Sequence, residues 1–93
     1  MINTFENGTN SNATVTTSDT VVVASNTARK YLCLVNSGSN PVFLGLGATA
    51  VADKGVYLAP NGGSFEINTD NLFIGAINGI AVGGNSNVTI FEK

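Results

Sequence analysis

The sequence predicts an all-β fold: a compact antiparallel β-sandwich or jelly-roll-like barrel of about seven or eight short strands. Short apolar runs rich in β-branched residues recur along the chain, and clusters of Gly, Asn, Ser and Pro separate them at intervals of about 8 to 12 residues. No helical periodicity alternates with these runs. The 93 residues have room for one core, which we expect at residues 20–93, after an N-terminal arm at residues 1–19.

Residues 1–19 are predicted to form an arm because Asn, Thr, Ser and Gly dominate them. Their apolar anchors, Ile2, Phe5 and Val15, are too few to offset the entropy of ordering the segment alone. We expect the arm to become ordered on a partner, and deletion of residues 1–18 to leave the domain folded. The alternative is that residues 14–17 supply the first strand of the sandwich, in which case truncation unfolds the domain.

The first half of the domain contains the clearest strand signals. Residues 21–24 form a β-branched run that favours a strand over a helix, and residues 31–35 have the length and composition of a buried strand. Turn residues at 36–41 then lead to residues 42–46, the expected hairpin partner. Glycine and β-branched residues make residues 47–54 a loop rather than a helix.

The second half predicts further strands at residues 56–58, 64–68, 72–77, 80–82 and 88–92. Asn78 and Gly79 lie between two of these apolar runs. Because Asn-Gly is the strongest short-range hairpin signal, we expect a tight turn there.

Several predicted strands carry apolar residues on both faces. A two-layer sandwich buries one face of each sheet, so its strands should alternate, yet residues 21–24, 31–35 and 72–74 do not. Large exposed apolar patches on soluble chains mark interfaces, and the excess therefore predicts self-association through residues 31–35 or 72–74. The alternative is a tightly curled barrel with a few apolar residues on its surface.

The charge and residue types exclude several classes of function. Four basic and six acidic residues give a net charge of -2, so no basic patch exists to bind nucleic acid or an anionic membrane. The start of the chain has neither the basic nor the apolar region of a signal peptide. With one cysteine and no histidine, a disulfide framework and most catalytic templates are missing. We expect no enzyme, no cofactor and no metal site.

A few residues invite a functional interpretation. Arg29 precedes a buried strand and could clamp a carboxylate across a subunit contact, or be a solvated charge. Cys33 lies in an apolar run and is expected to be a small buried side chain, since no histidine activates it. Tyr31 and Tyr57, with abundant Asn, could line a shallow glycan-binding face.

Three segments carry a resemblance to a known group of proteins: residues 28–36 (ARKYLCLVN), residues 40–47 (NPVFLGLG) and residues 55–67 (GVYLAPNGGSFEI). Their order of strands and turns resembles that of the small all-β structural proteins of tailed bacteriophages, over roughly residue 28 to the C-terminus. The resemblance implies a non-enzymatic virion structural protein, such as a capsid decoration or cement protein or another virion-surface protein. It carries no catalytic motif.

The same resemblance implies the partners and the location. We expect a homo-oligomer, with a trimer favoured, that binds the major capsid or tail protein, is made in the host cytoplasm and resides in the virion. The alternative function is a carbohydrate-binding module for host attachment. The residues expected to contact other copies or the lattice are Ile2, Phe5, Val15, Arg29, Tyr31, Leu32, Leu72 and Phe73.

Overall fold

The computed structural model describes residues 8–93, which form eight strands and no helix. It therefore has no helix long and apolar enough to cross a membrane in this part of the chain. The strands are β1 (Thr9–Val15), β2 (Thr20–Val23), β3 (Leu32–Asn36), β4 (Val42–Leu46), β5 (Val56–Leu58), β6 (Ser64–Ile67), β7 (Ile77–Ala81) and β8 (Ser86–Glu92). The prediction of an all-β antiparallel sandwich is confirmed.

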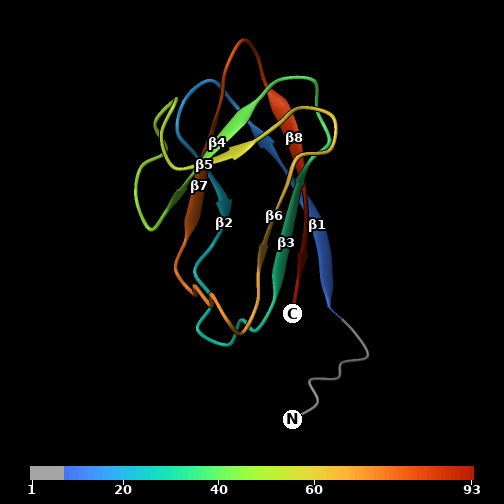
Figure 1. Ribbon diagram of the computed structural model, residues 1–93, viewed down its shortest axis with the longest axis vertical. Helices are drawn as coiled ribbons and strands as arrows, with labels where there is room; N and C mark the ends of the chain where they lie inside the picture. The colour runs from blue at the N-terminus through green and yellow to red at the C-terminus, as the bar shows by residue number, and fades with distance from the viewer. Residues whose placement is uncertain (1–7) are drawn as a thin grey trace.

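The strands form two four-stranded antiparallel sheets that lie side by side in Figure 1. The β1 sheet has the order β1-β8-β3-β6, and the β2 sheet has the order β2-β7-β4-β5. Every connection crosses from one sheet to the other except that between β4 and β5. This is the strand order of an eight-stranded jelly roll.

The core lies between the sheets and is built from alternate residues of the strands. Leu32 and Leu34 of β3, and Val42 and Leu44 of β4, are fully buried, as strand alternation requires. Within residues 8–93, thirteen buried apolar side chains join in one cluster. At about 25 cal/mol per Å² of apolar surface, this burial is the main term that offsets chain entropy.

The structure corrects the expected boundary between arm and domain. β1 (Thr9–Val15) pairs with β8 over seven residues, from Thr9 opposite Glu92 to Val15 opposite Ser86. The alternative of a first strand is therefore the better description of these residues, although the strand begins earlier than residue 14. The polar composition of residues 9–15 does not predict a strand, because an edge strand needs few inward-facing apolar side chains. Here Val15 is buried and Ala13 packs against the core. Ile2 and Phe5 lie outside the described residues.

Two expected hairpins are wrong. β3 and β4 belong to different sheets, and β4 pairs with β5 and β7 instead. Asn78 and Gly79 do not form a turn but lie in the middle of β7. A Cβ on Gly79 would lie 2.8 Å from Cγ2 of Val22, so glycine there allows the close approach of neighbouring side chains. Residues 72–76, expected as a strand, are irregular.

Candidate functional site

Three of the residues expected to contact other subunits lie inside the chain's own fold. Val15 and Leu32 are fully buried, and Arg29 is 1% exposed. Leu32 is inaccessible because its side chain points between the sheets, whereas those of its neighbours Tyr31 and Cys33 point outward. We therefore remove Val15, Leu32 and Arg29 from the contact surface.

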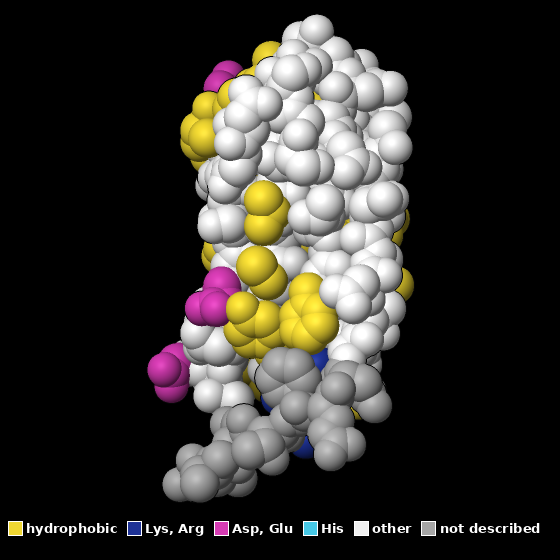
Figure 2. Space-filling model, turned by 90° about the vertical axis from the view of Figure 1, so that its right-hand side faces the viewer, with side chains coloured by type: hydrophobic (Ala, Val, Ile, Leu, Met, Phe, Trp, Pro, Cys, Tyr) yellow, Lys and Arg dark blue, Asp and Glu magenta, His cyan; other side chains and the backbone are white. Residues whose placement is uncertain are grey.

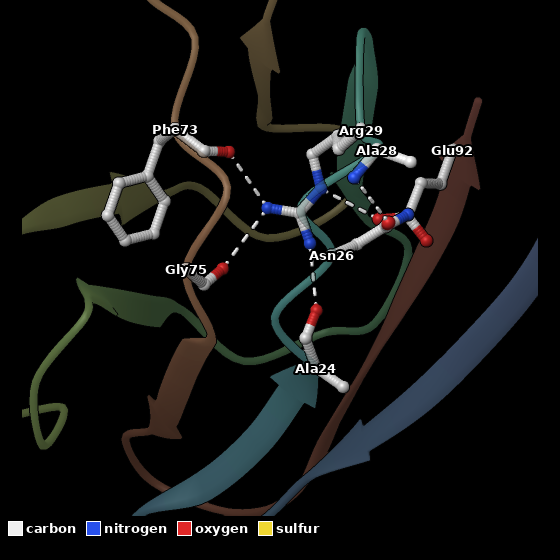
Figure 3. Close-up of polar contacts among 7 residues, drawn as sticks. All are labelled: Ala24, Asn26, Ala28, Arg29, Phe73, Gly75 and Glu92. Carbon is white, nitrogen blue, oxygen red and sulfur yellow. Dashed lines mark hydrogen bonds and ion pairs between the residues drawn. The ribbon is translucent and has the colours of Figure 1, made fainter.

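Arg29 joins the end of β8 to the segments that follow β2 and precede β7 (Figure 3). Its Nε donates to Oε2 of Glu92 at 2.7 Å, which also makes an ion pair. Its Nη1 donates to the carbonyl oxygens of Phe73 and Gly75 at 2.9 and 3.1 Å, and its Nη2 to that of Ala24 at 2.8 Å. The expected carboxylate partner exists, but it belongs to the same chain, so Arg29 stabilises the fold rather than a subunit contact.

A second polar cluster surrounds buried Asn36 at the end of β3. Its Nδ2 donates to the carbonyl oxygens of Asn40 and Leu58 at 2.8 and 3.1 Å. Its Oδ1 accepts from Oγ of Ser86 at 2.7 Å and from the backbone N–H of Gly38 at 3.1 Å. Within residues 8–93, every buried side-chain nitrogen and oxygen has a hydrogen-bond partner. This cluster is thus also part of the framework.

The outer face of the β1 sheet carries a row of half-buried apolar side chains. Tyr31, Cys33, Val35 and Phe91 alternate with the inward-facing residues of β3 and β8. Figure 2 shows hydrophobic side chains running along this face, with acidic side chains beside them at its lower end. The rings of Tyr31 and Phe91 are 6.1 Å apart. Cys33 is partly exposed here, not fully buried as expected.

Tyr31 is held by a carboxylate on the same face. Its hydroxyl donates to Oε2 of Glu66 at 2.6 Å. This hydrogen bond, with desolvation as the next cause, raises the pKa of Tyr31 to about 12. The phenol is therefore neutral and oriented at physiological pH.

The outer face of the β2 sheet exposes more apolar surface. Val21, Tyr57 and Val82 are 59%, 55% and 41% exposed. Phe43 lies opposite both Ile80 and Tyr57 on the neighbouring strands, so these three side chains form one row across β7, β4 and β5. We call Val21, Phe43, Tyr57, Ile80 and Val82 the apolar face.

The rings of Phe43 and Tyr57 pack against each other, with centroids 5.2 Å apart. The sequence pattern placed Val21 in a run with apolar residues on both faces and suggested Tyr57 for a glycan-binding face, but it gave no indication that Phe43, Ile80 and Val82 lie on the surface. The signal that would have found them is the alternation of side chains between the two faces of a strand. Once Val42 and Leu44 are assigned to the core, Phe43 must point outward, but that assignment requires knowing which side of β4 the core lies on.

The last expected contact segment lies in the loop before β7. Leu72 and Ile74 are 47% and 39% exposed, whereas Phe73 between them packs against the core. Leu72 therefore remains available to a partner and Phe73 only in part. Of the residues expected from sequence, the structure leaves Tyr31 and Leu72 on the surface, on different elements.

No family model, curated protein or solved structure matches this chain.

Proposed function

We propose that this chain is a non-enzymatic structural protein of a virus particle. It is a capsid decoration protein or another virion-surface protein of the tailed-bacteriophage kind, made in the host cytoplasm. It associates with its own copies and docks on the capsid or tail lattice. The observation that supports this proposal is the apolar face of the β2 sheet.

The apolar face has the composition of a protein contact. Contiguous exposed apolar side chains on a soluble domain mark an interaction surface, and aromatic residues such as Phe43 and Tyr57 are enriched at the centre of such surfaces. Val21 and Ile80 extend the surface beyond the aromatic pair.

Docking through this face has a small desolvation cost. The four strands below it, β2, β7, β4 and β5, carry no charged side chain, so no ionised group of these strands loses its water on binding. The hydrophobic contribution to the binding free energy is about 25 cal/mol per Å² of apolar surface covered. Repetition of this contact over a lattice reinforces a shell mechanically, without any chemical reaction.

Co-sedimentation with virus particles from cells that make this chain tests the proposal. The variant Val21→Ser with Tyr57→Ser removes the two most exposed side chains of the apolar face and touches no fully buried residue. We expect it to fold and to be lost from the particles. The matched control, Leu72→Ser with Ile74→Ser, removes exposed apolar surface elsewhere and should remain bound. Equal binding of both variants, or absence of the wild-type chain from the particles, would refute the proposal.

Carbohydrate-binding host attachment is the second candidate function. Jelly rolls occur in both capsid and lectin domains, so the fold does not separate the two. The exposed ring of Tyr57, supported by Phe43, is the observation that favours it, because sugar rings stack on such aromatic surfaces. Saturable binding on a glycan array that Tyr57→Ser abolishes and Tyr57→Phe retains would favour this function over the structural one.

A further inference from the structure

β1 is an open sheet edge. Its register with β8 is continuous from Thr9 to Val15, and it is the terminal strand of its sheet, seen on the outer side of the sandwich in Figure 1. No other described residue forms a backbone hydrogen bond with Thr9–Val15. Five of its seven side chains are exposed. A row of backbone N–H and C=O groups therefore faces away from β8, ready to pair with another strand.

The other three edges carry features that oppose such pairing. β2 contains a register shift between Val21 and Val23, and β5 has three residues. On β6, the carbonyl oxygen of Glu66 already accepts from Nδ2 of Asn71 at 3.1 Å. Bulges, short length and covering loops are the usual means by which proteins block sheet edges. Among residues 8–93, none of these features protects β1, and β1 also lacks proline and charge.

The sequence of β1, TNSNATV, suits pairing with itself. In an antiparallel pair related by a two-fold axis, each residue meets the residue at the mirrored position of the second copy. With the axis at Asn12, Asn10 lies opposite Thr14 and Ser11 opposite Ala13. Because no position is charged, no like charges meet, and the outward side chains of both copies stay on one face of the sheet.

We propose that two copies of this chain associate by antiparallel pairing of β1 with β1 about an axis at Asn12, which joins the two β1 sheets into one sheet of eight strands. This inference rests on the self-association in the proposed function and names the surface responsible. It replaces the expectation of a trimer with a two-fold dimer.

A charge-swap experiment on the full chain tests the register. Asn10 and Thr14 are exposed and lie opposite Phe91 and Asn87 within the sheet, so a charge at either position has no charged residue directly opposite it in its own copy. Asn10→Lys with Thr14→Lys sets like charges opposite each other twice per dimer. Asn10→Lys with Thr14→Glu sets opposite charges there. We expect sedimentation equilibrium to give a dissociation constant about tenfold higher for the first variant than for the second.

The second variant should dimerise at least as tightly as wild type. Asn10→Glu with Thr14→Glu should behave like the double-lysine variant, since the sign of the repelling charges is irrelevant. Equal dissociation constants for the like-charge and opposite-charge variants, or a wild-type chain that stays monomeric at high concentration, would overturn the inference.

Cross-linking gives an independent measurement at the axis. Cα atoms of directly opposed strand residues lie about 4.5–5.5 Å apart, within the range of a disulfide. In a Cys33→Ser background, Asn12→Cys should therefore form a covalent dimer on mild oxidation. The control Ser64→Cys, exposed on β6 at the opposite edge of the sheet, should not. Equal cross-linking of both, or none with Asn12→Cys, would contradict the proposed pair.

These experiments separate the inference from the proposed function. If the dimer responds to the charge swaps but the chain is absent from virus particles, the pairing stands and the virion role fails. If the chain is on the particles but the swaps leave its association unchanged, the virion role stands and the pairing fails.

Discussion

Arg29 is the only arginine of the chain, and all three nitrogens of its guanidinium donate hydrogen bonds. It donates four hydrogen bonds to the chain segments that end β2, precede β7 and end β8. Lysine could not replace it, because a guanidinium presents a rigid fork of donors and an ammonium is a compact point charge. A 93-residue domain buries little surface, so one such side chain carries a sizeable share of its stability.

We therefore predict that Arg29→Met lowers the free energy of unfolding by about 3–5 kcal/mol, the usual effect of removing one partner from a buried ion pair. Arg29→Lys should lose less, because charge is retained. Glu92→Gln should lose less than Arg29→Met, since an amide oxygen can still accept from Nε and the guanidinium keeps its three carbonyl partners. Urea denaturation followed by circular dichroism measures all three. A wild-type midpoint for Arg29→Met would show that the cluster contributes nothing.

The second prediction at the residue scale concerns the titration of Tyr31, whose pKa is raised to about 12 by the hydrogen bond to Glu66. In a Tyr57→Phe background, Tyr31 is the only tyrosine, and its ionisation can be followed by ultraviolet absorbance. We expect a midpoint well above 10, which Glu66→Gln lowers. Because folding raises this pKa, the stabilisation is complete below about pH 10 and is lost as the pH rises toward 12. A midpoint near 10 in both proteins would disprove the contact.

At the scale of elements, sequence patterns identified strands better than they identified their neighbours. The predicted strand at residues 31–35 overlaps β3 (Leu32–Asn36), and that at residues 42–46 coincides with β4, because short runs of large apolar residues between turn signals are typical of buried strands. Their assignment to different sheets depends on the long-range order of the jelly roll, which no local pattern encodes. Gly79 shows the same limit, since a glycine that allows a turn and a glycine that allows close packing are identical in sequence.

The candidate surfaces were predictable to a similar degree. An excess of apolar residues correctly pointed to side chains on the outside, such as Tyr31 and Leu72. It did not distinguish Leu32, which is buried, from Tyr31 beside it. That distinction depends on the parity of the strand relative to the core, and parity is set by packing across the sandwich.

Truncation from the N-terminus has a different expected outcome once β1 is part of the sandwich. Removing residues 1–18 deletes the β1–β8 ladder, the buried Val15 and the hydrogen bond from Ala81 N–H to the carbonyl oxygen of Thr16. We expect the truncated protein to lose cooperative unfolding. A cooperative transition at the wild-type temperature would restore the view of residues 1–18 as an arm.

At the scale of the whole molecule, the proposed dimer fixes the direction of the apolar face. An antiparallel pair that keeps outward side chains on one side has its two-fold axis perpendicular to the shared sheet. The β2 sheet packs on the inner side of the β1 sheet, so both β2 sheets of the dimer lie on the same side of the shared sheet. Both apolar faces then point the same way, and one dimer can bind the lattice through two contacts, one from each copy.

Two-point docking predicts that dimerisation controls attachment to particles. Once one copy is bound, its partner is held at a high effective concentration near the next lattice site, which increases apparent affinity by about 10²-fold or more without a new contact. At concentrations where Asn10→Lys with Thr14→Lys is monomeric, it should therefore bind immobilised particles about 10²-fold more weakly than Asn10→Lys with Thr14→Glu, mainly through faster dissociation. Both variants keep the apolar face, because Asn10 and Thr14 lie on the other sheet. Adding Val21→Ser and Tyr57→Ser to the dimeric variant should abolish its binding, whereas equal binding of monomeric and dimeric variants would show that each copy docks alone.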